Sequence, residues 1–215
     1  MKIFPSYYRQ AEEKINVITH AFGFLLSVIA FIFFIKKSIE LQNLGYAIST
    51  IVYAVSLMVL YAASTGYHSA KGRKLRSRLN ILDHAAIYIL IAGTYTPFTL
   101  ITLKGTLGYI LFSIVWAVAV VGVILKLFYT GKFKLLSTIM YVAMGWIVIF
   151  AIKPLLENLP TNGIWLLFAG GFFYTLGAVL FMFDKLKFNH AIFHVFVLLG
   201  SISHFLAIYF YVNPH

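Results

Sequence analysis

The sequence has no cysteine and only six acidic residues, and both scarcities narrow what the protein can be. Without cysteine there is no disulfide framework and no thiolate metal site, so any bound metal must use histidine, carboxylate or water. Charged residues make up only 11% of the chain, whereas hydrophobic residues make up 61%. This is more apolar surface than a soluble core can bury, so the composition predicts a membrane protein.

The few charges are mostly of one sign. The 17 basic and six acidic residues give a formal net charge of +11, which in a soluble domain would suggest nucleic-acid binding. In a small multi-pass protein the same excess arises because lysine and arginine collect in cytoplasmic loops and contact anionic headgroups. We therefore expect membrane lipids as partners and no nucleic acid, and no protein partner is predicted.

Seven apolar runs follow one another along the chain, each near the roughly 20 residues needed to cross a bilayer. They lie near residues 17–35, 44–67, 83–103, 107–127, 135–152, 163–183 and 190–212. The connections between them are short, and the sequence has no obvious internal repeat. The pattern predicts an all-α bundle of seven transmembrane helices, formed as a single integral membrane domain over residues 1–215.

The orientation follows from the distribution of lysine and arginine. The N-terminus and the second, fourth and sixth connections hold 13 of these residues, and the opposite side holds only Lys36, Lys37, Lys104 and Lys153. The positive-inside rule then places the N-terminus in the cytoplasm and, after seven crossings, the C-terminus outside. We expect a multi-pass protein of the plasma membrane.

Histidines gather near the predicted cytoplasmic side. His190 and His194 open the seventh helix at a spacing of four, which puts both imidazoles on one face, as a divalent metal requires. His68 ends the second apolar run and so lies at the same level. The alternative is that these are interfacial histidines bonded to neighbouring carbonyls.

Two further polar residues fall at this depth. Asp83 is expected to begin the third helix, within reach of the histidines, and Ser64 lies one turn before His68. Aspartate at a helix start is also a common N-cap, so a capping role for Asp83 competes with a role in the site and can coexist with it.

The first helix offers a polar stripe of Glu13, Asn16 and His20 at spacings of three and four. We interpret these residues as contacting the ligand histidines and orienting them, without binding the metal themselves. The competing interpretation makes Glu13 and Asn16 interfacial caps and His20 a buried histidine bonded to a neighbour. No role is assigned to His84, His204 or His215.

Three imidazoles from two helices, with a fourth position open, match catalytic zinc better than closed structural zinc. Zinc lowers the pKa of a bound water to about 7, and a carboxylate such as Asp83 could orient that water or accept its proton. Ser64 could bond the same water. Imidazole also accepts copper, nickel and iron.

Several segments together resemble the bacterial hemolysin III branch of the progestin and adipoQ receptor superfamily. They are Glu13–Asn16, Thr19–His20, Ser64–His68, Leu82–His84, Ala92–Pro97, Phe133–Ser137, Met144–Trp146, Ile152–Pro154 and Asn189–His194.

The resemblance implies seven helices with a cytoplasmic N-terminus and a zinc ion held by His68, His190 and His194. It also implies that Ser64 and Asp83 contact a zinc-bound water. Eukaryotic members of the superfamily act as hormone receptors linked to ceramide hydrolysis, and the alkaline ceramidases are more distantly similar.

Three functions are compatible with these residues. The first is a zinc-dependent hydrolase of a ceramide-like lipid amide, with Asp83 as base. The second is a non-enzymatic regulator of membrane lipid homeostasis or fluidity, in which zinc pins helices together. The third, pore-forming cytolysis, ranks last because the charges lie at helix ends rather than along the full membrane depth.

Overall fold

The computed structural model of the protein describes residues 8–103 and 105–214. In this part of the chain every regular element is helical, and seven helical segments are long and apolar enough to cross a membrane. The elements are α1 (Gln10–Leu41), α2 (Leu44–Ser69), α3 (Arg73–Pro97), η1 (Phe98–Thr102), α4 (Thr106–Tyr129), α5 (Lys134–Gly145), η2 (Ile147–Ala151), α6 (Ile152–Asn158), α7 (Thr161–Phe181) and α8 (Asn189–Tyr211). The predicted all-α, multi-pass architecture is confirmed.

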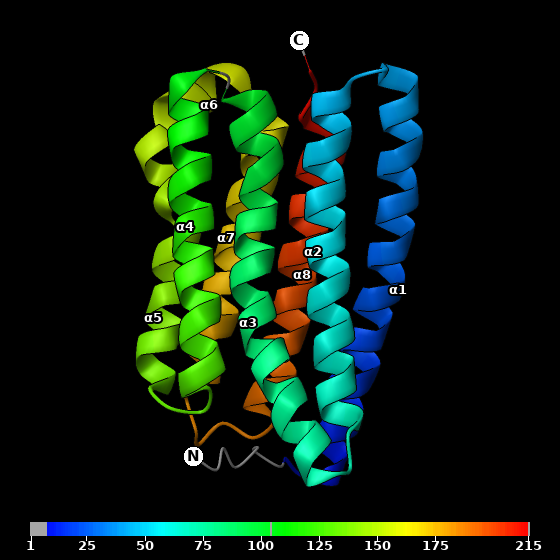
Figure 1. Ribbon diagram of the computed structural model, residues 1–215, viewed down its shortest axis with the longest axis vertical. Coiled ribbons are helices and arrows are strands. Elements are labelled where there is room, and N and C mark those ends of the chain that lie inside the picture. Colours follow the sequence, from blue (N-terminus) through cyan, green and yellow to red (C-terminus); the bar gives the residue numbers. More distant parts are fainter. Residues whose placement is uncertain (1–7, 104, 215) are drawn as a thin grey trace.

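The helices form one bundle in which chain neighbours run antiparallel (Figure 1). Helix α8 packs against both α7 and α1, and α3 packs against both α2 and α4, so segments far apart in sequence lie side by side. The end of α2, the start of α3 and the start of α8 share one end of the bundle with the start of α1 (Figure 1). Helix α8 ends at the opposite end, as seven crossings require. Which end faces the cytoplasm stays a prediction.

The bundle carries its apolar side chains outward as well as inward. Large hydrophobic residues such as Phe150, Trp165 and Leu44 are exposed on the helix surfaces, where lipid rather than water is the expected solvent. Some buried hydroxyls bond within their own helix: Thr50 donates to the Tyr46 carbonyl at 2.7 Å. Others join helices: the Tyr61 hydroxyl on α2 donates to Ser201 Oγ on α8 at 2.8 Å.

Helix α3 begins ten residues earlier than the sequence predicted. It starts at Arg73 with Gly72 as N-cap, so Asp83 lies well inside the helix and the N-cap interpretation of Asp83 is wrong. The apolar-run criterion missed this segment because its first turns are basic and polar. They extend the helix beyond the hydrophobic span instead of forming a loop.

The fifth span is not one continuous helix. It consists of α5, the 3-10 turn η2 and the short α6, where the sequence predicted a single helix over 135–152. At Pro97 the α-helix of the third span passes into the π-helical turn η1. Proline lacks the N–H that would continue the α-helical ladder, so the hydrogen bonds re-form at a wider spacing.

Two glycines of α7 allow this helix to pack closely against α8. A side chain at Gly170 would collide with the ring of His204, and one at Gly177 would collide with Phe196. The lack of a side chain at these two positions therefore allows the two helices to pack closely. Gly171 differs, because a side chain there would make only ordinary contact with Trp146.

Candidate metal centre

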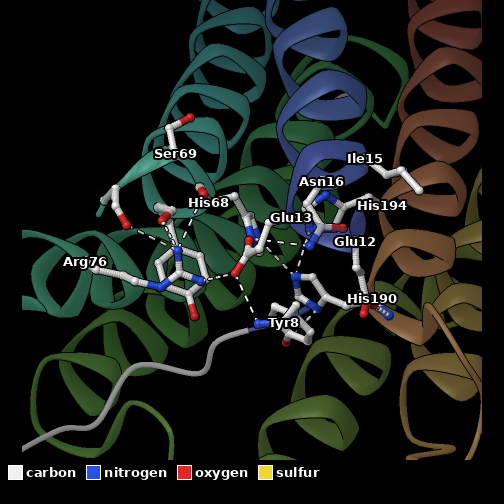
Figure 2. A network of polar contacts seen from close by, with 12 residues as sticks. Tyr8, Glu12, Glu13, Ile15, Asn16, His68, Ser69, Arg76, His190 and His194 are labelled. Atoms are coloured by element: carbon white, nitrogen blue, oxygen red, sulfur yellow. Dashed lines mark hydrogen bonds and ion pairs between the residues drawn. The ribbon is translucent and has the colours of Figure 1, made fainter. Parts of the chain in front are cut away.

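The three predicted ligand histidines meet inside the bundle. His68 comes from the last turn of α2, and His190 and His194 come from the first turns of α8. Their relative exposures are 4%, 6% and 1%. The Nε2 atom of His190 lies 3.1 Å from that of His68 and 3.0 Å from that of His194, and one nitrogen from each ring lies within 4.8 Å of the others. Figure 2 shows the rings turned toward one another.

The Glu13 carboxylate fixes which nitrogen of His68 faces this point. Its Oε2 lies 2.7 Å from His68 Nδ1, so Nδ1 carries the proton and donates to the carboxylate, as metal-ligating histidines commonly do. The Nε2 lone pair of His68 then points at the other two rings. Imidazole nitrogens that converge in this way suit a bound cation, and the donor set fits a borderline-soft metal such as zinc.

Arg76 holds Glu13 in place. Its guanidinium donates to Glu13 Oε1, and it also donates to the Tyr67 carbonyl at 3.1 Å at the end of α2. The side chain is only 2% exposed. Arg76 therefore ties α1, α2 and α3 together behind the histidine cluster (Figure 2).

The sequence alone did not indicate a role for Arg76, because the residue falls in a basic segment that was predicted to connect two helices. The spacing of the polar residues could have indicated it. Arg76, Asn80 and Asp83 follow one another at intervals of four and three, which places them on one face of a helix. All three side chains are buried.

Tyr8 covers His190 and was also missed. Its ring stacks on the His190 ring with centroids 4.4 Å apart, and its hydroxyl lies 3.1 Å from His190 Nδ1. Burial raises the pKa of the Tyr8 phenol, and nearby acidic groups, including Asp83, raise it further. The neutral hydroxyl oxygen can accept a hydrogen bond from the Nδ1–H group of His190, which leaves His190 Nε2 directed at the centre of the cluster. Tyr8 precedes the first helix, so helical periodicity in the sequence could not indicate that it contacts the histidines.

The stripe on α1 contacts the histidines as a group. The His20 ring stacks on His194 at a centroid distance of 3.5 Å, and the Asn16 amide nitrogen lies 3.4 Å from His68 Nδ1. Neither nitrogen of His20 has a hydrogen-bond partner among the described residues. His20 is therefore not the neighbour-bonded buried histidine of the competing interpretation.

Asp83 and Ser64 occupy different positions around the cluster. The Asp83 carboxylate lies 3.9 Å from His84 Nδ1, beyond hydrogen-bond distance, and Asp83 lines a cavity together with His190 and His194. Ser64 is fully buried on α2, and its Oγ has no partner within the described part of the chain.

The cavity has a volume of about 450 Å³ and runs between α3, α5, α7 and α8. His190, His194 and Asp83 line it together with apolar residues, among them Ile87, Leu90, Ile91, Val142, Phe193 and Val197. His204 also lines it, and its Nε2 is bonded to the Leu167 carbonyl at 3.0 Å. This arrangement brings a cluster of potential metal ligands to the wall of an apolar chamber.

A seven-helix membrane protein with a buried cluster of three histidines is the class that this fold and site define. The chain matches the family model described as haemolysin-III related over residues 8–205. It therefore belongs to the haemolysin-III family, as its motifs predicted. Multi-pass insertion follows for the chain, and the plasma membrane is the usual location of such proteins in bacteria.

Similar proteins cover almost the whole chain. Hemolysin-3 of Bacillus cereus is 48% identical over 94% of this chain and 93% of its own length. The Hemolysin-3 homolog of Bacillus subtilis (strain 168) is 46% identical over 93% of this chain and 94% of its own length. The monocyte to macrophage differentiation factor of Homo sapiens is 28% identical over 94% of this chain and 86% of its own length, which supports the predicted place in the progestin and adipoQ receptor superfamily.

Proposed function

We propose that the protein is a zinc-dependent hydrolase of a membrane lipid amide. The observation that carries the proposal is the convergence of three buried imidazole nitrogens within 4.8 Å of one another, with two of the rings, His190 and His194, lining a cavity that Asp83 also lines. A structural zinc site has no need of such a cavity. An enzyme acting on a lipid needs both an apolar space for the acyl chain and polar groups at its end.

Each residue has a role in this proposal. His68, His190 and His194 hold the zinc, and Glu13 and Tyr8 keep two of these rings in the ligating orientation. Bound zinc would supply a Lewis acid and lower the pKa of a water. Asp83 accepts a proton from the attacking water at its carboxylate and returns it to the departing nitrogen. Ser64 Oγ orients the water.

The bond changes balance without any further reactant. Water adds its oxygen to the amide carbonyl carbon, the carbon–nitrogen bond breaks, and the nitrogen leaves as an amine that has gained a proton. The products are a fatty acid and an amine. The apolar wall of the cavity keeps bulk water from the acyl chain.

The test compares the wild-type protein with His190→Ala/His194→Ala and with Asp83→Asn, all purified through the same detergent and chelator washes. We expect about one zinc per chain in the wild type and in Asp83→Asn, and none in the double variant. Fatty-acid release from a ceramide-like substrate should fall at least about 100-fold in Asp83→Asn, the scale of general base catalysis. A zinc-loaded protein that releases no fatty acid from any lipid amide would refute the hydrolase.

A second candidate is a non-enzymatic regulator of membrane lipid state, in which zinc pins α2 to α8. The observation that favours it is the tie that Arg76 and Glu13 make across α1, α2 and α3 behind the cluster. Here Asp83→Asn would leave function intact, measured as membrane fluidity or fatty-acid composition in a deletion strain carrying the variant. Loss of complementation by Asp83→Asn would favour the enzyme.

The relatives carry the name hemolysin, so lysis needs its own measurement. Dye release from liposomes that rises with protein dose would support pore formation. We rank this last, because the buried charged groups of the site gather at one end of the bundle, and a pore needs polar groups along the full depth.

A further inference from the structure

A buried lysine lies at the cavity, and neither the metal centre nor the proposed reaction uses it. Lys126 comes from the last turn of α4 and is 4% exposed. Its Nζ donates to Ser137 Oγ on α5 at 2.6 Å and lies 5.6 Å from the centre of the Tyr141 ring. All three residues line the cavity.

The ammonium of Lys126 has no carboxylate partner. None of the ion pairs formed within residues 8–103 and 105–214 includes it. A buried, unpaired charge in a membrane helix is costly, and a lysine this close to a helix end could instead extend to the interface. Lys126 turns inward to the cavity wall, which suggests that an anion is bound there.

The surrounding charges point the same way. Lys132 and Lys134 also line the cavity beside Lys126, and Lys134 is paired with Asp184 at 2.7 Å. The other carboxylate on the cavity wall is that of Asp83. The lysines thus outnumber the carboxylates among the residues that line this space.

We propose that Lys126 and Ser137 bind the phosphate group of a membrane lipid whose acyl chain occupies the apolar part of the cavity. The ammonium offers three donors, of which Ser137 takes one, and the Ser137 hydroxyl keeps its own proton for donation. A phosphate offers several charged acceptor oxygens to such a set, and lysine is a common phosphate ligand.

The lipid, rather than free phosphate, is assigned because the same cavity continues into apolar walls. Ile87, Leu90 and Val142 line it with Lys126, and a free phosphate would leave that surface without a partner. Tyr141 fixes the geometry, since its hydroxyl donates to the His84 carbonyl at 3.0 Å while its ring lies beneath the ammonium. The inference rests on the proposed function only in placing a lipid in this cavity.

The experiment measures binding to the purified, zinc-loaded protein in detergent. Its ligands are a lysophosphatidic acid, the monoacylglycerol with the same acyl chain, and inorganic phosphate. We expect Lys126→Met to weaken lysophosphatidic acid binding about 10-fold or more, the loss expected for a charge-assisted contact, and to leave monoacylglycerol binding unchanged. The matched control is Lys185→Met, which removes an exposed lysine from the loop before α8 that does not line the cavity.

The outcomes separate this inference from the proposed function. Equal lysophosphatidic acid binding by wild type and Lys126→Met would overturn the inference, as would inorganic phosphate binding as tightly as the lipid. Should Lys126→Met fail to fold, Ser137→Ala is expected to weaken the same binding several-fold while Lys126→Arg retains it. Zinc content and fatty-acid release are measured on the same samples, so a Lys126-dependent phosphate site without hydrolysis would uphold this inference and refute only the hydrolase.

Discussion

At the scale of single residues, Glu13 connects the histidine cluster to Arg76. One carboxylate oxygen accepts from His68 Nδ1 at 2.7 Å, and the other accepts from Arg76 and from the Tyr8 backbone N–H. A ligand histidine bonded to a carboxylate is both held in its tautomer and made a better donor to the metal. The orientation of His68 therefore depends on a residue 55 positions away in the chain.

Glu13→Gln removes the charge that faces His68 and Arg76, so we expect zinc affinity to fall about 10- to 100-fold, the usual effect of losing such a partner. Competition with a chromophoric chelator measures it. Glu40→Gln, an exposed change at the far end of α1, is the control. Unchanged affinity in Glu13→Gln would mean that His68 needs no carboxylate to ligate.

At the scale of helices, close approach at glycine decides where α4 can lie. Gly108, in the first turns of α4, sits directly against the Thr99 and Leu103 carbonyl oxygens at the end of the third span. These are backbone atoms at the turn η1, so they cannot rotate away as a side chain can. The position of α4, and with it that of Lys126, depends on this contact.

Gly108→Ala is therefore expected to destabilise the protein by about 1–3 kcal/mol, the usual cost of overpacking. Thermal unfolding in detergent measures the loss as a lower midpoint. Gly145→Ala is the matched control, because a side chain at Gly145 meets no atom within 4 Å. A midpoint in Gly108→Ala equal to that of the control would show that α4 can shift without cost.

At the scale of the whole molecule, the histidine cluster lies at one end of the bundle, and the orientation of the chain decides which side of the membrane it faces. The absence of cysteine makes a direct test possible. In intact cells a membrane-impermeant thiol reagent should label Glu157→Cys, which lies exposed in the last turn of α6 at the end remote from the histidines, and spare Lys185→Cys until the membrane is opened. The reverse labelling pattern would place the metal centre outside and contradict the positive-inside argument.

The sequence by itself determined the spans and the identity of the clustered residues. Membrane spans can be recognised from apolar runs because the bilayer requires every spanning helix to have about the same length and an apolar surface. The spacing of His190 and His194 reports a shared face because a helix repeats every 3.6 residues. The stripe from Glu13 to His20 was found for the same reason.

Only the tertiary structure decided the contacts between helices and the ends of the spans. The polar start of α3 continues a helix that the apolar run does not include, so Asp83 was misplaced at an N-cap and Arg76 was counted as a loop charge. Two contacts could not be read from the sequence, that of Tyr8 with His190 and that of Lys126 with Ser137. Each joins two segments whose relative position no sequence periodicity indicates. Local patterns fix which face of a helix is polar, whereas the partner of that face depends on how all seven helices pack.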